Sequence, residues 1–221
     1  MTNFIFVVPA RFGSKGVPGK NFKKLKDKAL IDYTLDLLKN LTSINFHVIV
    51  STDNLEYKTK VKDYGYLFHY RSIELSNDDS MISDVIYNAI SQFKDVVLNF
   101  SLDNWVILLE PTSPLRSLKV VNDLVLNIIN NDFLSYVSVV ENSSPRWTLE
   151  QGEYQRERIS SSLRQKRNII YQEVGVFYAS EWNNFLQNGL ISRFSKTILV
   201  PKLEAFDIND LEDWDIVYKL I

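Results

Sequence analysis

The sequence contains no cysteine among its 221 residues. Disulfide bridges, a thiolate nucleophile and a cysteine-ligated zinc site are therefore excluded. Long hydrophobic runs are also missing. No segment approaches the ~20 apolar residues of a membrane helix, and the first residues lack the basic segment and apolar core of a secretory signal. We therefore expect a cytoplasmic protein that does not span a membrane.

An excess of positive charge is missing as well. Lysine and arginine total 25 against 27 acidic residues, the formal net charge is -2, and the isoelectric point is about 5.8. This balance argues against a nucleic-acid surface, which requires a basic face. Hydrophobic residues make up 45% of the chain, enough for the full core of one domain over residues 1–221. Any cationic site must therefore be local.

Glycine and proline are scarce, with seven and six residues, but they cluster near the N-terminus. Residues 9–21 (PARFGSKGVPGKN) contain three glycines and two prolines, together with Arg11, Lys15 and Lys20. They follow an apolar run at residues 4–8 that is typical of a strand buried on both faces. Glycines let backbone N–H groups approach an anion, and spaced cations neutralise several negative charges. The pattern predicts a polyphosphate site at the end of this strand, where α/β proteins bind ligands.

Neither of two common phosphate motifs fits this loop. A P-loop has four residues between its first glycine and the Gly-Lys-Ser/Thr, whereas five residues separate Gly13 from Gly19, and Asn21 follows Lys20. The dinucleotide fingerprint G-x-G-x-x-G is absent too. A surface loop with solvated lysines is the alternative interpretation.

The rest of the chain alternates between helical and strand patterns. Helices are predicted at 29–41, 54–62, 81–93, 120–130, 182–186 and after 214, and strands at 46–53, 66–70, 105–109, 136–140, 169–178 and 197–200. Asp53 and Asn54 are predicted to cap the second helix. The alternation predicts a doubly wound, mostly parallel α/β sheet with strand 105–109 at its centre. Residues 141–172 break the pattern and are expected to protrude as a small subdomain.

Residues 8–21 resemble, without a gap, the signature loop of the acylneuraminate cytidylyltransferases, also called CMP-sialic acid synthetases. That loop reads Ile/Val-Pro-Ala-Arg-x-Gly-Ser-Lys-Gly-x-Pro-Gly-Lys-Asn. The related CMP-Kdo synthetases typically carry a shorter variant, so residues 15–18 favour the sialic branch. The resemblance implies a Rossmann-like nucleotidyltransferase fold. It also implies nucleotide contacts by Ala10, Arg11, Gly13, Ser14, Lys20 and Asn21.

Two further positions resemble nucleotide-binding segments of the family. Arg71 stands where the family has Arg-Pro-x-x-Leu, although the proline is missing here. Ser80 stands where the family has Asp-x-Ser. The resemblance implies that both contact the nucleotide. The alternatives are a solvated charge for Arg71 and a helix-capping cluster around Ser80.

The sugar-binding positions resemble the family with two changes. Glu110 replaces a glutamine, and an ionised glutamate cannot donate the hydrogen bond that glutamine can. Val174 replaces an asparagine. We therefore expect an unusual sugar or set of sugar substituents. The resemblance implies substrate contacts by Glu110, Arg164, Gln165, Val174 and Tyr178.

Asp207-Ile208-Asn209 resembles the family's Asp-Ile-Asp segment. Alternate residues of an extended segment face the same way, which suits a Mg²⁺ ion that also binds phosphate oxygens. Asn209 offers only a neutral amide oxygen in place of the second acid, so it would be the weaker of the two ligands. The alternative is that this segment only leads to Asp210 as the cap of the last helix.

The resemblance implies an enzyme that joins CTP to a nine-carbon 2-keto sugar acid and releases pyrophosphate. Arg11, Lys20 and Asp207 would be its catalytic residues, Mg²⁺ its cofactor, and residues 141–172 the contact of a homodimer. Neither a nucleic acid nor a membrane is expected as a partner. Two alternatives are a nucleotidyltransferase that uses a sugar phosphate with another triphosphate, and a non-catalytic sugar-nucleotide binding protein with a decayed metal site at Asn209.

Overall fold

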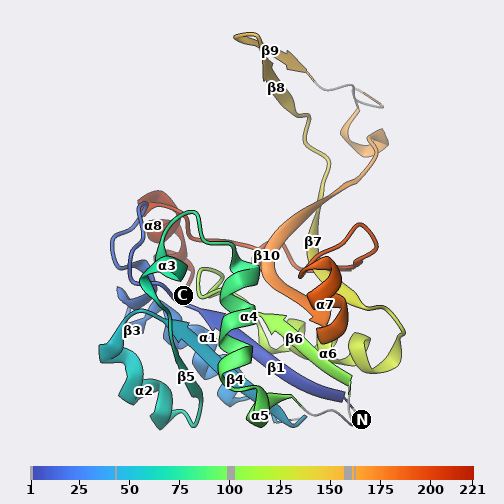
Figure 1. The fold of residues 1–221 in the computed structure, drawn as a ribbon. Helices are drawn as coiled ribbons and strands as arrows, with labels where there is room; N and C mark the ends of the chain where they lie inside the picture. The colour runs from blue at the N-terminus through green and yellow to red at the C-terminus, as the bar shows by residue number, and fades with distance from the viewer. Residues whose placement is uncertain (1, 43, 99–102, 157–160, 162) are drawn as a thin grey trace.

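A seven-stranded sheet runs through the computed structural model, which describes residues 2–42, 44–98, 103–156, 161 and 163–221 (Figure 1). The strand order is β11-β7-β10-β6-β1-β4-β5. Strand β10 is antiparallel to β6 and β7, and the other neighbours are parallel. The strands are β1 (Thr2–Pro9), β4 (Phe46–Thr52), β5 (Leu67–Tyr70), β6 (Asp103–Leu108), β7 (Ser135–Asn142), β10 (Ile170–Glu181) and β11 (Lys196–Leu199). The predicted mostly parallel sheet with β6 at its centre is therefore confirmed.

Helices cover both faces of this sheet. They are α1 (Leu30–Lys39), α2 (Lys58–Asp63), α3 (Ile73–Ser76), α4 (Ile82–Gln92), α5 (Lys94–Val97), α6 (Leu118–Asn130), α7 (Trp182–Asn188) and α8 (Leu211–Leu220). Strand β1 shows the division, because Phe4 and Phe6 pack in the cluster that contains residues of α1 and α6. Ile5 and Val7 pack in the cluster that contains residues of α4 and α7. The alternation of a strand thus divides one apolar run between two cores, as in a doubly wound fold.

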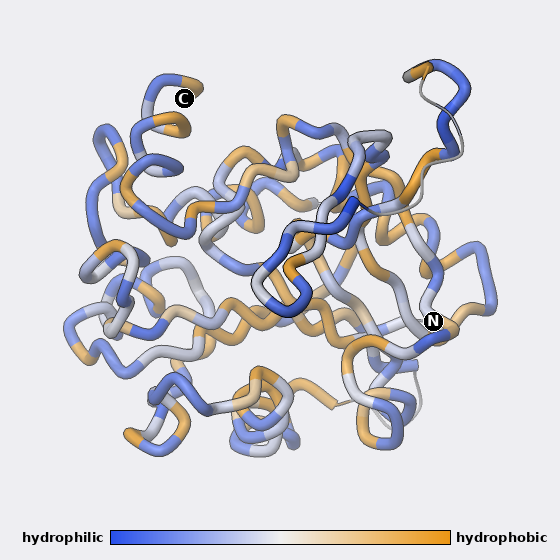
Figure 2. The backbone as a smooth tube through the Cα atoms, turned by 90° about the horizontal axis from the view of Figure 1, so that it is seen from above, coloured by the Kyte–Doolittle hydropathy of each residue, from blue (hydrophilic) through white to orange (hydrophobic). Residues whose placement is uncertain are grey.

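Hydrophobic residues colour the central strands of the sheet, and the helices around them alternate between hydrophobic and hydrophilic (Figure 2). No helix in the described ranges is long and apolar enough to cross a membrane.

The segment between β7 and β10 projects away from the body as an arm (Figure 1). It carries a two-stranded hairpin, β8 (Trp147–Glu150) and β9 (Glu153–Arg156), and the short helix η3 (Arg164–Lys166). All residues of both hairpin strands are exposed. The remaining short elements, η1 (Lys20–Phe22), β2 (Lys24–Leu25), β3 (Lys28–Ala29) and η2 (Leu55–Tyr57), lie around α1 and α2.

The residues after β4 correct one prediction. Asn54 does cap the following turn, η2, by accepting a hydrogen bond from the Glu56 backbone N–H. Asp53 does not cap it. The Asp53 carboxylate instead accepts a 2.6 Å hydrogen bond from the Phe12 backbone N–H. Asp53 therefore ties the end of β4 to the loop after β1, a role that local sequence patterns do not indicate.

Candidate active site

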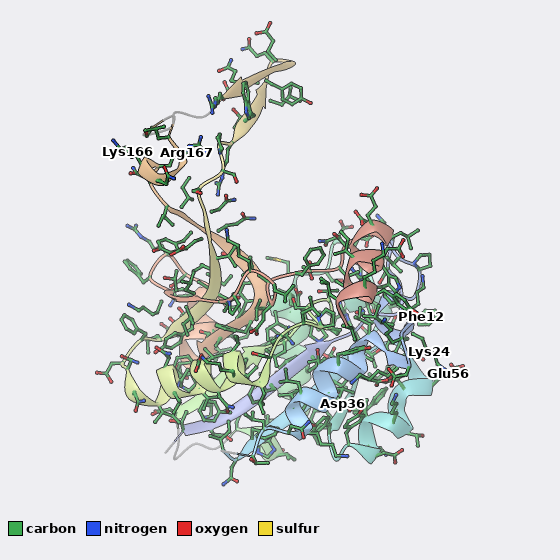
Figure 3. All side chains as sticks on the ribbon, turned by 180° about the vertical axis from the view of Figure 1, so that it is seen from behind. Phe12, Lys24, Asp36, Glu56, Lys166 and Arg167 are labelled. Carbon is green, nitrogen blue, oxygen red and sulfur yellow. The ribbon has the colours of Figure 1, made fainter. Side chains whose placement is uncertain are left out.

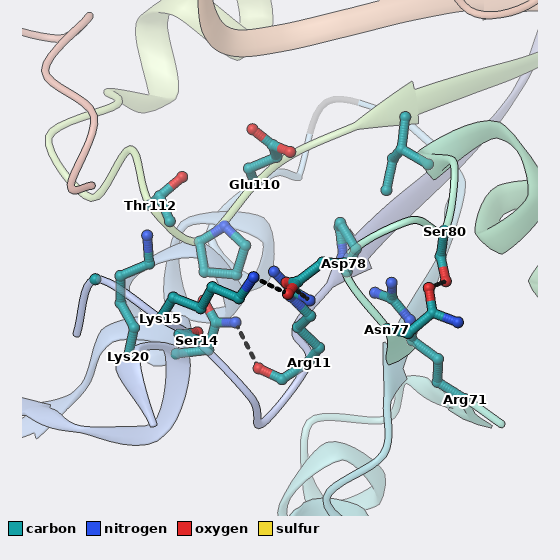
Figure 4. A pocket seen from close by; sticks show the side chains of 15 residues that line it. Arg11, Ser14, Lys15, Lys20, Arg71, Asn77, Asp78, Ser80, Glu110 and Thr112 are labelled. Atoms are coloured by element: carbon teal, nitrogen blue, oxygen red, sulfur yellow. Dashed lines mark hydrogen bonds and ion pairs between the residues drawn. The ribbon is translucent and has the colours of Figure 1, made fainter. Parts of the chain in front are cut away.

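A cleft of about 370 Å³ opens where β1 and β6 end (Figure 4). It lies at the carboxyl edge of the parallel strands, where ligands of open α/β sheets bind. The residues predicted from the sequence that line it are Arg11, Ser14, Lys20, Asn21, Arg71, Ser80 and Glu110. These side chains come from four separate stretches of the chain. The fold thus gathers most of the predicted nucleotide contacts around one cleft.

The glycine-rich loop is held in shape by its own polar groups. The Asn21 amide donates a 2.9 Å hydrogen bond to the Arg11 carbonyl oxygen, closing the loop at its base. Gly19 adopts a left-handed conformation, with φ of 63°, immediately before η1. Ala10 is buried and continues the pairing with β4, and neither it nor Gly13 lines the cleft. Of the predicted loop contacts, the structure thus leaves these two outside the cleft wall.

Arg11 and Lys15 converge on one carboxylate, that of Asp78 (Figure 4). The N–O distances are 2.7 Å from Arg11 and 2.5 Å from Lys15. Hydrogen bonds from Lys15 and Arg11 lower the pKa of Asp78. Asp78 thus occupies the position at which two cations could bind a phosphate. Sequence reasoning missed this residue because the surrounding polar run also matches a helix cap.

Arg71 and Ser80 lie on the other wall of the cleft. Arg71 is only 6% exposed, and its Nε donates a 2.5 Å hydrogen bond to the Leu75 carbonyl oxygen. Burial, and then the charge of Arg11, lowers its pKa. The interpretation of Arg71 as a solvated surface charge is therefore wrong. The Ser80 hydroxyl lies 2.7 Å from the Glu74 carbonyl oxygen.

Lys20 links the loop to the C-terminal segment. Its Nζ donates a 2.6 Å hydrogen bond to the backbone carbonyl oxygen of Ile208. Burial lowers the pKa of Lys20, whereas the charges of Asp207 and then Glu110 act in the opposite direction. Lys20 therefore connects the glycine-rich loop, to which it belongs, with the acidic segment before α8, and it lies near the turn after β6.

Backbone contacts hold this junction together. A Cβ at Gly16 would lie 2.1 Å from the Asn209 carbonyl oxygen, so only glycine fits there without displacement. The Ile208 N–H donates a 2.9 Å hydrogen bond to the Thr112 carbonyl oxygen. The glycine-rich loop and the segment around Asp207, which were predicted to serve one triphosphate, are thus in direct contact, and the turn after β6 is hydrogen-bonded to that segment.

A second hollow of about 380 Å³ adjoins this junction. Val174, Asp207 and Asn209 line it, as predicted for the sugar and metal positions. The Asp207 Oδ1 atom is buried and has no hydrogen-bond partner among the described residues. This orphaned, hard oxygen suits a divalent cation. No cluster of three or more acidic, histidine or cysteine ligands exists in the described ranges, so a cation here would take further ligands from a substrate or water.

The Asn209 side chain is exposed beside Asp207, and its amide nitrogen lies 3.5 Å from the Asp207 carbonyl oxygen. Its backbone N–H donates a 2.8 Å hydrogen bond to Asp213. Asp210 caps α8 through the Asp213 N–H. The predicted capping role of Asp210 is confirmed. The cap does not involve the Asp207 carboxylate.

Glu110 lies between the cleft and the second hollow. Its Oε2 is 3.3 Å from the position that a Cβ would take at Gly175, which lines the second hollow. Burial, and then the negative charge of Asp207, raises the pKa of Glu110. Tyr178, on β10 opposite Leu108, has a raised pKa because of burial and the nearby charges of Glu173 and Glu110.

Arg116 supports this turn from within the core. Its guanidinium donates to the carbonyl oxygens of Glu110 at 2.8 Å and Val176 at 2.5 Å. Burial lowers the pKa of Arg116 to about 10. Arg116 thus joins the turn after β6 to strand β10, which fixes the position of Glu110 relative to Gly175.

The predicted sugar contacts at 164 and 165 are not brought to this site by their own chain. Gln165 is exposed in η3 on the arm, next to Lys166 (Figure 3). The side chain of Arg164 lies outside the part that the structure describes. Within a single chain, Gln165 is therefore separated from Glu110, Val174 and Tyr178.

Most of the chain matches the sequence pattern of a known protein family. The family described as Cytidylyltransferase matches residues 5–194, most of the chain. The chain belongs to this family. The N-acylneuraminate cytidylyltransferase of Escherichia coli O18:K1:H7 is 28% identical to this chain over 97% of the chain and 51% of that enzyme. The chain thus spans about half the length of that relative.

A second relative has nearly the same length as this chain. The CMP-N,N'-diacetyllegionaminic acid synthase of Legionella pneumophila is 30% identical over 97% of the chain and 94% of that enzyme. A solved CMP:2-keto-3-deoxy-manno-octonic acid synthetase, in complex with CTP, superposes with a TM-score of 0.68 at 16% identity. It covers 99% of this chain and 98% of its own, and at this identity it shows the shared fold.

Proposed function

We propose that this cytidylyltransferase transfers the CMP group of CTP to a nonulosonic acid, a nine-carbon 2-keto sugar acid, and releases pyrophosphate. The observation that carries this proposal is the contact of Lys20 with Ile208, next to Asp207. It unites a cationic loop with an orphaned carboxylate at the carboxyl edge of the sheet. The names of the relatives that match nearly the whole chain support the class of substrate.

The chain would act mainly by positioning and by neutralising charge. Arg11, Lys15 and the backbone of the loop would bind the triphosphate, with Asp78 displaced from the two cations. The anomeric hydroxyl would attack the α-phosphorus in line, forming the new P–O bond as the bond to pyrophosphate breaks. Lys20 would neutralise the charge that develops on the phosphate oxygens.

Asp207, with the weaker ligand Asn209, would hold a Mg²⁺ ion. Its orphaned Oδ1 fits such an ion. When bound, Mg²⁺ would neutralise charge on phosphate oxygens.

The sugar acid would occupy the region between the cleft and the second hollow, in reach of Glu110, Val174 and Tyr178. Gln165, exposed on the arm, could contribute only from a second copy of the chain. We therefore propose a homodimer formed through the arm. The exposed hairpin aromatics Trp147, 58% exposed, and Tyr154, 75% exposed, support a buried contact there.

The proposal is tested with a panel of 2-keto sugar acids, each incubated with CTP, ATP, GTP or UTP and with Mg²⁺. We expect pyrophosphate release and a CMP-sugar only with CTP and one class of sugar acid. Reactions without enzyme serve as the control. Turnover of a sugar 1-phosphate with another triphosphate, or CTP binding with no turnover of any sugar acid, would contradict the proposal.

A further inference from the structure

Two carboxylates from distant parts of the chain flank Lys20. Glu110 follows β6 and lines the same cleft as Lys20, and Asp207 precedes Ile208, whose carbonyl oxygen accepts the Lys20 hydrogen bond. We propose that Glu110 is the second carboxylate ligand of the divalent cation, so that the ion is shared between the turn after β6 and the segment before α8. This inference rests on the proposed function and adds a ligand to the same site.

The backbone brings the two segments together. The Ile208 N–H donates to the Thr112 carbonyl oxygen at 2.9 Å, which joins the neighbour of Asp207 to the turn that begins at Glu110. The Ser113 hydroxyl lies 3.2 Å from the Gly175 carbonyl oxygen. Glu110 Oε2 is itself 3.3 Å from the position that a Cβ would take at Gly175, a residue that lines the same hollow as Asp207.

One of the two carboxylates has an orphaned oxygen. Asp207 Oδ1 is buried and accepts no hydrogen bond from a described residue. Glu110 is partly buried at the wall of the neighbouring cleft. The two nearby cations donate hydrogen bonds to backbone carbonyl oxygens. Arg116 donates to those of Glu110 and Val176, and Lys20 donates to that of Ile208. A divalent cation between the carboxylates would remove their repulsion.

Asn209 cannot supply the missing charge. Its side chain is exposed, and its amide nitrogen lies 3.5 Å from the Asp207 carbonyl oxygen. A second carboxylate must therefore come from another segment, and Glu110 is the acidic residue of the turn whose Thr112 carbonyl oxygen accepts the Ile208 hydrogen bond.

The test measures Mn²⁺ binding by calorimetry to the full chain, without nucleotide and then with CTP. Glu110→Gln keeps the shape and removes the charge, and should weaken Mn²⁺ binding at least about tenfold. The double variant Glu110→Gln, Asn209→Asp should regain affinity to within about threefold of wild type. Asp78→Asn is the charge-matched control from the other end of the cleft and should change Mn²⁺ affinity in the absence of nucleotide less than about twofold.

Unchanged Mn²⁺ affinity in Glu110→Gln would overturn the inference, as would a double variant that binds no better than Glu110→Gln. A change confined to the KM of the sugar acid would make Glu110 a substrate contact instead. If Glu110→Gln does not fold, Glu110→Asp must still weaken Mn²⁺ binding because its carboxylate is withdrawn by one methylene. The nucleotide-free measurement does not require turnover, so its result is separate from the outcome of the substrate panel.

Discussion

The Lys20 ammonium donates a 2.6 Å hydrogen bond to the carbonyl oxygen of Ile208, 188 positions later in the chain. This contact joins the glycine-rich loop to the acidic segment. The same two segments also meet at Gly16, where a Cβ would lie 2.1 Å from the Asn209 carbonyl oxygen. The proposed site is therefore an assembly of the two ends of the chain on one sheet edge.

Replacing Lys20 by alanine should lower turnover by on the order of a hundredfold, because a charge positioned for the transition state would be lost. Steady-state kinetics with CTP and the accepted sugar acid measure the effect. Lys24→Ala, an exposed lysine on β2, should behave as wild type. Turnover of Lys20→Ala within a factor of two of wild type would remove Lys20 from the mechanism.

Gly16→Ala should separate the loop from the C-terminal segment. The new methyl would overlap the Asn209 carbonyl oxygen, and such overpacking costs about 1–3 kcal/mol of unfolding free energy. Urea unfolding should show a lower free energy of unfolding, and calorimetry should show a lower affinity for CTP. Gly13→Ala is the matched control, since a Cβ there meets nothing within 4 Å. Equal behaviour of the two variants would show that the contact at Gly16 is unimportant.

Asp78→Asn should strengthen CTP binding a few-fold. The variant removes the carboxylate that pairs with Arg11 and Lys15 and would compete with phosphate for them. The gain should shrink as salt is raised, because these groups are partly exposed and screened. Calorimetry at two salt concentrations measures it, with Asp79→Asn as the neighbouring control. Weaker binding by Asp78→Asn would instead make Asp78 a support of the loop.

His69 should make stability depend on pH. It is fully buried, with Nδ1 2.9 Å from the Ser51 hydroxyl and Nε2 2.8 Å from Asn88 Oδ1, and burial lowers its pKa. Below about pH 6.5 the unfolded chain therefore binds a proton that the folded chain does not, and stability falls as pH decreases.

Urea unfolding between pH 7.5 and 5 measures this dependence. His69→Gln should be less stable at pH 7.5 but should lose less stability on acidification than wild type. The pKa of His47 is also lowered by burial, so His47→Gln is the parallel control for the second histidine. Identical slopes for wild type and His69→Gln would contradict the prediction.

The arm should carry the dimer contact. The double variant Trp147→Ser, Tyr154→Ser removes two exposed aromatic rings from the hairpin and should shift sedimentation towards the monomer. Leu126→Ser, which removes an exposed apolar side chain from α6, should not. A wild-type chain that is monomeric at the concentration of the assay would refute the proposed dimer.

Local patterns predicted most elements to within a few residues, because strand alternation, helical spacing and turn residues act over short distances. They failed where a polar residue had two local explanations. Asp53 follows a strand and precedes a helical turn, so a cap was expected, yet it binds the Phe12 N–H across the cleft edge. Asp78 lies in a run that matches a cap, yet it pairs with two cations of another loop. Such partners depend on which strands are neighbours.

The sequence by itself determined the succession of the main strands and helices along the chain, the two-sided burial of β1 and the clustering of glycines and cations after it. These features follow from side-chain periodicity and backbone freedom, which are properties of a few adjacent residues. Only the tertiary structure decided that Lys20 meets Ile208, that Glu110 stands beside Gly175 near Asp207, and that Gln165 lies away on the arm. Those relationships depend on strand order and on close backbone packing between segments far apart in the chain, and no local pattern encodes either.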